Sequence, residues 1–155
     1  MYLVSACLAG FNTRYDGTNC MDERVRKLVS AGMALPVCPE QLGGLQTPRP
    51  PMEFSQPGGG ASVLDGVGEV CLAAARGGRP ECVEAFKTAL LKGARETLAI
   101  AMAYGIKKAI LKDGSPSCGT AHVHCRGRKE PGRGVAAELL RREGIEVAGV
   151  DSLQG

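Results

Sequence analysis

Four short apolar segments alternate with helical patterns, and this alternation constrains the fold more than any other feature of the chain. The apolar segments contain many β-forming residues, and they comprise residues 1–6, 33–37, 106–112 and 145–150. The helical patterns place apolar side chains on one face and end at or just before a glycine, and they comprise residues 21–32, 80–104 and 134–144. Strands joined through helices form parallel sheets with helices on both faces. The sequence therefore predicts a single-domain α/β protein over residues 1–155, with a three-layer Rossmann-like fold and a mostly parallel sheet of about four to five strands.

The size and composition of the chain disfavour several classes of protein. A chain of 155 residues with 44% hydrophobic and 23% charged residues is ordinary for one soluble globular domain. Aromatic residues make up only 4% and there is no Trp, which disfavours a protein that stacks single-stranded nucleic acid on aromatic rings. No apolar run approaches the roughly 18 residues of a membrane span, and no signal peptide is visible. We therefore expect a cytoplasmic protein with no membrane partner.

The formal net charge of +3 is concentrated in one short segment, residues 124–134. Four basic residues there stand against a single acid, Glu130; they are Arg126, Arg128, Lys129 and Arg133. This excess equals the whole net charge, so the rest of the chain is balanced. The segment is either a solvated loop or a contact for an anion such as a nucleotide phosphate.

Three of the seven cysteines follow predicted strands, namely Cys7, Cys38 and Cys118. Because the carboxyl ends of parallel strands meet at one edge of a sheet, we expect these three thiols to lie along the same rim, where ligands bind in such folds. Three thiolates can hold an iron–sulfur cluster with one open iron, or Zn²⁺ with an open catalytic position. The alternative is that all three are buried apolar cysteines.

The other four cysteines lack such a placement. An odd number of cysteines in a chain of this size indicates thiols or metal ligands rather than a disulfide framework. We interpret Cys71 and Cys82 as core or surface thiols, and Cys125 as a loop thiol that could reach a site. Nothing in the pattern assigns a role to Cys20.

Polar residues next to the three motif cysteines are candidates for chemistry. Glu40 follows Cys38 by two residues and should face the same rim, where it could activate water or donate a proton, unless it caps a surface loop. Ser115 and Ser117 could each hydrogen-bond a ligand or simply form the turn. Ser5 is predicted to hydrogen-bond within the site.

Two arginines and two histidines complete the set of candidates. Arg14 and Arg49 lie in turn-forming contexts and suit planar acceptors, although Arg14 could instead pair with Asp16. His122 and His124 are possible metal ligands, but their alternation also predicts that both lie on one face of a short strand. Residues 38–60 are dense in Pro and Gly and predict a long functional or disordered loop.

At these residues the sequence resembles a known family. The stretches that carry the resemblance are, in order, "VSACLAG" with "RYDG", "VCPEQLGGLQTPRPPME", "FKTALLKGA", "ILKDGSPSCG" and "GRGVAAELLRREGIEV". Together they resemble the family catalogued as domain of unknown function 523, whose characterised members are thiouracil desulfidases of the TudS type. The resemblance implies a [4Fe-4S] cluster held by Cys7, Cys38 and Cys118, with Glu40 and Ser115 as catalytic residues. It also implies non-redox removal of sulfur from a small thiolated base such as 4-thiouracil, giving the oxo base and hydrogen sulfide.

The chain departs from the family pattern at positions near this expected site. Gly114 stands where the family usually has a larger polar residue, so we include it among the candidate substrate-binding residues with Ser5, Arg14, Arg49 and Ser117. Residues 69–82 resemble an insertion before the long helix. Two other functions remain open: a sulfur transferase or tRNA-thiolation partner, and a metal or redox sensor without activity. A tRNA substrate requires a broad basic face, and one basic loop supplies too little.

Overall fold

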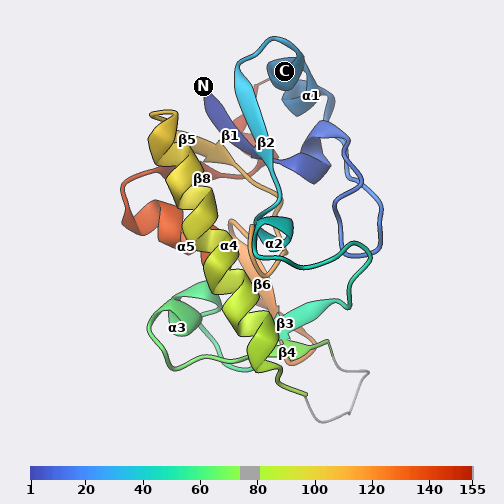
Figure 1. Ribbon diagram of the computed structural model, residues 1–155, viewed down its shortest axis with the longest axis vertical. Helices are drawn as coiled ribbons and strands as arrows, with labels where there is room; N and C mark the ends of the chain where they lie inside the picture. Colours follow the sequence, from blue (N-terminus) through green and yellow to red (C-terminus); the bar gives the residue numbers. More distant parts are fainter. Residues whose placement is uncertain (74–80, 155) are drawn as a thin grey trace.

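A computed structural model describes residues 1–73 and 81–154, and it contains two four-stranded sheets (Figure 1). The first sheet has the order β2-β1-β5-β8, and every neighbouring pair in it is parallel. Its strands are β1 (Tyr2–Ser5), β2 (Ala34–Val37), β5 (Lys108–Ile110) and β8 (Glu146–Ala148). These are the four strands that the sequence predicts, so the expected parallel sheet is confirmed.

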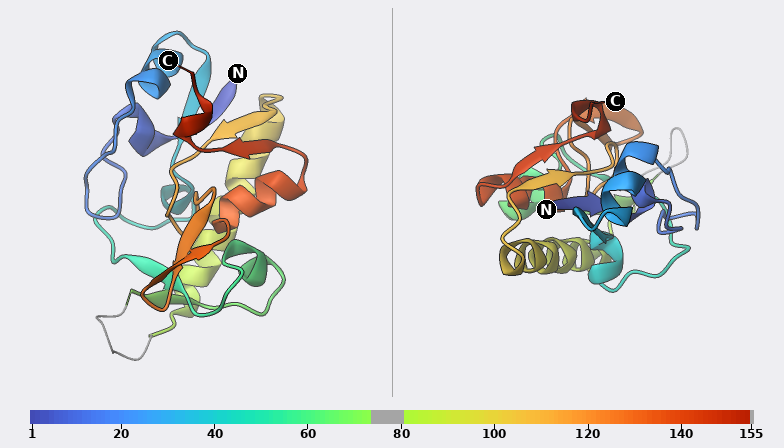
Figure 2. Two further views of the ribbon diagram at one scale, coloured as in Figure 1. Left: turned by 180° about the vertical axis from the view of Figure 1, so that it is seen from behind. Right: turned by 90° about the horizontal axis from the view of Figure 1, so that it is seen from above.

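Helices cover both faces of this first sheet, as expected for a three-layer α/β fold. On one face, Leu3 and Ala109 pack with side chains of α4 (Glu84–Ala103) and α5 (Val135–Arg142). On the other face, Val4 and Ile110 pack with α1 (Glu23–Ser30) and the short 3₁₀ helix η2 (Val150–Ser152). Neighbouring strand residues point to opposite faces, which explains the nearly continuous apolar character of these strands. The view from above shows α4 on one side of the sheet and α1 on the other (Figure 2, right).

The second sheet was not predicted from the sequence. Its order is β4-β3-β6-β7, with a parallel pair between β3 and β6 and antiparallel pairs at both edges. Its strands are β3 (Met52–Phe54), β4 (Val70–Leu72), β6 (His122–Cys125) and β7 (Arg128–Pro131). Phe54 and Val123 pack against Leu90 of α4 and Val135 of α5, so α4 supports both sheets.

Two sequence predictions are corrected in this part of the chain. Residues 38–60 are not one irregular loop, because they contain α2 (Pro39–Leu42) and the buried strand β3. The stretch 62–70, for which no element was predicted, contains most of α3 (Gly60–Leu64) and the start of β4. These elements have only three to five residues each, too few for a periodic pattern to be visible. The helix predicted from residue 80 begins at Glu84, and residue 80 itself lies outside the described residues.

A pair of glycines brings α2 against the long helix α4. A Cβ atom on Gly43 would collide with the backbone carbonyl of Ala89, and one on Gly93 would collide with the carbonyl of Pro39. Only residues without a side chain allow this approach of two backbones. The contact fixes the position of α2, which carries Glu40.

Cys71 and Cys82 form a disulfide, so their interpretation as separate core or surface thiols was wrong. Cys71 is fully buried in β4, and Cys82 forms an antiparallel bridge with it. The disulfide therefore ties the edge of the second sheet to the segment that leads into α4. Among the described residues, no helix is both long enough and apolar enough to cross a membrane.

Candidate functional site: three thiols and a buried carboxylate on one cavity

The carboxyl ends of three neighbouring strands carry the three motif cysteines. Cys7 lies in the 3₁₀ helix η1 (Ala6–Ala9) directly after β1, Cys38 comes immediately after β2, and Cys118 follows β5 across a longer turn. Because β1 lies between β2 and β5, Cys7 is placed between the other two. β2 lies on one side of β1, and β5 lies on its other side. This change of side is the switch in strand order at which α/β sheets bind ligands.

All three thiols line one cavity of about 490 Å³. Nine of the ten predicted site residues line it: Ser5, Cys7, Arg14, Cys38, Glu40, Arg49, Gly114, Ser115 and Cys118. Ser117 is not among the lining residues. Its side chain is 1% exposed, and its Oγ has no hydrogen-bond partner within the described part of the chain. Its prediction as a substrate contact therefore lacks support from its position.

The three thiols interact electrostatically but do not converge on a single point. Burial, with smaller contributions from the charges of Cys38 and Glu40, raises the pKa of Cys118 to about 12. The pKa of Cys7 is also raised, first by a hydrogen bond with the Cys20 thiol and then by burial and by the charges of Cys118, Cys20 and Cys38. Within residues 1–73 and 81–154, no three His, Cys, Asp or Glu side chains lie close enough to share one metal ion.

This donor set fits a cluster of several irons better than one zinc ion. A tetrahedral zinc site places its sulfur ligands on one ion at about 2.3 Å. A [4Fe-4S] cluster instead takes each thiolate on a different iron, so its ligands stand further apart around a larger volume. Three soft sulfur donors line one cavity here, and they are the donor type that iron–sulfur clusters take.

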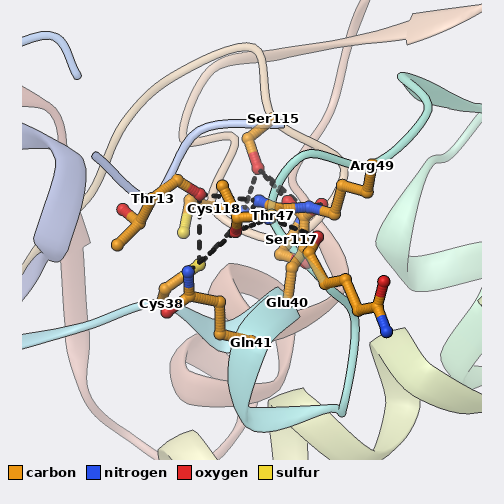
Figure 3. A network of polar contacts seen from close by, with 10 residues as sticks. Thr13, Cys38, Glu40, Gln41, Thr47, Arg49, Ser115, Ser117 and Cys118 are labelled. Atoms are coloured by element: carbon orange, nitrogen blue, oxygen red, sulfur yellow. Dashed lines mark hydrogen bonds and ion pairs between the residues drawn. The ribbon is translucent and has the colours of Figure 1, made fainter. Parts of the chain in front are cut away.

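A buried ion pair holds Glu40 at the wall of the cavity (Figure 3). Arg49 Nε donates to Glu40 Oε1 at 2.9 Å, and both side chains are almost fully buried. The same guanidinium donates to Thr47 Oγ1 at 2.8 Å and to the carbonyl oxygen of Thr13 at 2.9 Å. Its Nη2 also lies 3.9 Å from the sulfur of Cys38. Arg49 thus connects the carboxylate, the β1–α1 loop and one of the three thiols.

The hydroxyl of Ser115 is oriented toward Glu40 by the turn that contains it. Its Oγ accepts hydrogen bonds from the backbone N–H groups of Ser117 and Cys118, each at 3.1 Å. With both acceptor positions taken, the hydroxyl proton is directed to Glu40 Oε2, 3.4 Å away. Ser5 has a structural contact of its own, since its Oγ accepts from the backbone N–H of Lys112 at 2.9 Å.

Arg14 lies at the cavity without a strong partner. No ion pair joins it to Asp16 among the described residues, and its guanidinium lies 5.7 Å from the ring centre of Tyr15. Asp16 is occupied by Thr18, which donates to it from both backbone and hydroxyl. The charge of Arg14 still acts on Asp16, because it lowers the pKa of that carboxyl after the hydrogen bonds from Thr18, so the pairing of Arg14 with Asp16 stays a prediction.

Sequence reasoning missed the fourth thiol near the site, Cys20. Its backbone N–H donates to the carbonyl of Cys7 at 3.1 Å. The hydrogen bond with the Cys7 thiol, together with the positive charges of Lys112 and Arg14, lowers the pKa of Cys20 to about 7. No pattern could have indicated this contact, because Cys20 belongs to an irregular loop that returns to the sheet.

Sequence reasoning also missed Asp113 and the opposite wall of the cavity. Asp113 lies between β5 and the Ser-Pro-Ser-Cys-Gly turn, and the opposite wall comes from the second sheet, with Met52, Glu53, His122 and His124. The prediction that His122 and His124 share one face of a short strand is confirmed, and neither belongs to a group of three metal-binding side chains in the described residues. Their position could not be predicted, because the second sheet itself was not.

Comparisons with known proteins find similar chains over nearly the whole length of this one. A sequence model of the family described as 2-thiouracil desulfurase matches residues 2–151. YbbK, an uncharacterized protein of Bacillus subtilis strain 168, is 38% identical over 156 residues, which cover 99% of this chain and 97% of that protein. A solved structure of a [4Fe-4S]-dependent thiouracil desulfidase, TudS, is 36% identical and superposes with a TM-score of 0.77 over 98% of this chain and 91% of that chain.

Proposed function

This chain belongs to the 2-thiouracil desulfurase family, and we propose that it is an iron–sulfur-dependent desulfidase that acts on a thiolated nucleobase. The reaction replaces the thiocarbonyl sulfur by the oxygen of water and releases hydrogen sulfide, with no net oxidation or reduction. The observation that supports the proposal most strongly is the convergence of three thiols and one buried carboxylate on a single cavity. A small thiolated base such as 4-thiouracil or 2-thiouracil is the proposed substrate.

Cys7, Cys38 and Cys118 are the residues that would hold the [4Fe-4S] cluster. When bound, such a cluster supplies a Lewis-acidic iron with affinity for a soft sulfur atom. The thiols lose their protons on binding iron, because the thiolate is the ligand form. Burial of Cys7 and Cys118 keeps this part of the site away from bulk water.

Glu40 is the proposed base that takes a proton from the attacking water. Its Oε1 is fixed by Arg49, which leaves Oε2 as the oxygen that faces Ser115 and the cavity. General bases act from carboxylates that are held within hydrogen-bond reach of the water they activate. Ser115 is proposed to orient that water or to pass a proton between it and Oε2, since its hydroxyl already points to this oxygen.

The cavity suits a small neutral ring. Its volume of about 490 Å³ falls in the range of sites that enclose small ligands and cofactors. The lining combines apolar groups such as Pro51 and Met52 with a few fixed polar groups. A site of this composition holds a flat heterocycle by its faces and selects it by hydrogen bonds at its edge.

The test is sulfide release by the reconstituted protein. The chain is loaded anaerobically with iron and sulfide, and loading is followed by the absorption near about 400 nm that iron–sulfur clusters give. We expect stoichiometric uracil and hydrogen sulfide from 4-thiouracil, with one ¹⁸O atom in the uracil when the assay is run in labelled water. A protein that loads the cluster but releases no sulfide from either thiouracil isomer would refute the proposal.

A second measurement separates the desulfidase from a sulfur transferase. A transferase passes the sulfide-level sulfur to an acceptor carbon, such as an activated base in tRNA, so its turnover depends on the acceptor and free sulfide does not accumulate. A desulfidase releases sulfide without any acceptor. Turnover in the absence of an acceptor is therefore the result expected here.

A further inference from the structure

Asp113 organises the wall of the cavity next to Ser115. Its Oδ1 accepts hydrogen bonds of 2.9–3.0 Å from four backbone N–H groups, those of Gly114, Thr120, Ala121 and His122. Its Oδ2 lies 2.7 Å from Nδ1 of the His122 imidazole. One carboxylate thus closes the turn that contains Ser115 and Cys118 and also fixes the plane of a histidine ring.

The bonding of Asp113 determines which nitrogen of His122 carries the proton. Burial alone would raise the pKa of Asp113, but the backbone N–H groups that point at Oδ1 outweigh it and hold that pKa well below its usual range. An ionised carboxylate can only accept hydrogen bonds, so Nδ1 of His122 must donate to it. In the neutral ring the lone pair is then on Nε2, which is an acceptor.

The other ring nitrogen, Nε2, lies at the wall of the cavity beside Gly114. His122 and Gly114 both line the cavity. Within the described residues no hydrogen bond to Nε2 occurs, whereas Nδ1 is bonded. A Cβ atom on Gly114 would come within 3.0 Å of Nε2, and Gly114 has a φ of +85°. A glycine at this position therefore leaves room for the imidazole edge beside Ser115.

Thiolated pyrimidines carry a donor that matches this acceptor. In both 2-thiouracil and 4-thiouracil, the ring nitrogen N3 bears a hydrogen and is bonded directly to the thiocarbonyl carbon. A hydrogen bond to N3–H would fix the position of that carbon relative to the rest of the cavity. A site built to accept a hydrogen bond from an N–H group strongly disfavours analogues without that group, because the acceptor atom of the protein is then left unpaired.

We propose that His122, held by Asp113, accepts the hydrogen bond from the ring N–H adjacent to the thiocarbonyl carbon and so selects the substrate. The inference rests on the proposed function for the identity of the ring. It makes His122 a substrate-binding residue and Asp113 a positioning residue. It also defines the substrate class more narrowly, as thiolactam rings with a free N–H beside the thiocarbonyl.

Methylated substrates test the proposal on the unaltered protein. We expect 1-methyl-4-thiouracil to be processed with a kcat/KM within about threefold of that of 4-thiouracil, because N1 is remote from the reacting carbon. For 3-methyl-4-thiouracil we expect kcat/KM to fall by at least about tenfold, because the donor is replaced by a methyl group. Equal values for the two methylated substrates would overturn the inference.

Two substitutions of His122 test the roles of its two ring nitrogens separately. His122→Asn keeps a donor near Nδ1 for Asp113 but has nothing at Nε2, so it should raise KM for 4-thiouracil and remove the preference for the 1-methyl substrate. His122→Gln places an amide near the Nε2 position and should recover part of the preference. Both should keep the absorption near about 400 nm, which reports cluster loading. Lys92→Gln, on the exposed face of α4 and outside the cavity lining, is the control and should behave as wild type.

A spectroscopic measurement decides the inference even without turnover. The chain has only two histidines, so ¹⁵N-histidine labelling of the cluster-loaded protein gives two imidazole spectra, assigned with His124→Gln. We expect uracil to shift the Nε2 resonance of His122, and 3-methyluracil to leave it unchanged. If no thiobase releases sulfide, the proposed function fails, and the uracil titration still answers the question of His122. A His122 resonance that uracil does not move would overturn the inference.

Discussion

The two sheets supply different chemistry to the same cavity. The first sheet presents the carboxyl ends of parallel strands, and its contribution is three thiols and, through α2, the buried carboxylate of Glu40. The second sheet is mixed and contributes the opposite wall, including the imidazoles of His122 and His124. The long helix α4 packs against side chains of both sheets and fixes their relative position.

We propose that this difference separates the cysteines that would hold a cluster from the histidine that would contact a substrate. Strand ends in a parallel sheet are rigid, since each strand is paired on one or both sides and the faces are covered by helices. Metal ligands need such fixed positions. The second sheet supplies the opposite wall of the cavity, so a change of substrate contact there can leave the three thiols of the first sheet untouched.

The largest effect should follow removal of any ligand from the first sheet. In Cys7→Ala, Cys38→Ala or Cys118→Ala, two thiols remain and cannot retain the cluster. We expect the iron content and the absorption near about 400 nm to fall to background, with loss of sulfide release. Cys125→Ala, a matched loss of one free buried thiol in the second sheet, is the control and should load normally. Full loading of any of the three variants would remove that residue from the ligand set.

Loss of the carboxylate should separate chemistry from cluster binding. Glu40→Gln keeps an oxygen for Arg49 but cannot take a proton, so we expect turnover to fall by at least about 100-fold with iron content unchanged. The measurement is sulfide release per bound iron. An active Glu40→Gln protein would contradict the role of Glu40 as the base, whereas loss of iron would assign it to the cluster site instead.

Asp113→Asn should destabilise the turn between the two sheets. The carboxylate accepts four backbone N–H groups, so we expect the free energy of unfolding at pH 7 to fall by about 3 kcal/mol. Because the folded-state pKa of Asp113 is lowered, its stabilisation is complete above the unfolded-state pKa and is lost as the pH falls toward the folded-state value. Urea denaturation should thus show a difference from wild type that shrinks below about pH 4. A difference that does not depend on pH would show that the charge has no part in it.

The disulfide should matter for the second sheet and not for the first. Cys82→Ser opens a link between residues 11 apart in sequence, and we expect it to lower the free energy of unfolding by about 2 kcal/mol. Iron loading should be unchanged, because the ligands belong to the other sheet. Urea denaturation with and without reductant checks this, since reductant should reduce the stability of the wild type to that of the variant. Loss of iron in Cys82→Ser would mean that the two sheets do not act independently.

The sequence predicted the first sheet well because its strands lie within mostly apolar segments of five to seven residues, and each segment is followed by a clear helix or turn. The meeting of Cys7, Cys38 and Cys118 followed from that pattern alone, because parallel strands bring their ends to one rim. The strands of the second sheet are equally short, but those over residues 122–125 and 128–131 consist largely of polar and charged residues, so no apolar segment marks them. Asp113 gains its role only when the turn folds back on it. Contacts such as that of Cys20 with Cys7 depend on the path of a loop, and the spacing of apolar residues along the sequence does not predict such a path.

The division of roles between the two sheets is tested most directly by two measurements made on both Cys7→Ala and His122→Asn. The first is the iron content. The second is the kcat/KM for 1-methyl-4-thiouracil divided by that for 3-methyl-4-thiouracil. We expect Cys7→Ala to lose its iron and all sulfide release. We expect His122→Asn to keep its iron and its ability to release sulfide, with a ratio that falls toward one. Loss of iron in His122→Asn, or an unchanged ratio with full iron, would contradict the account.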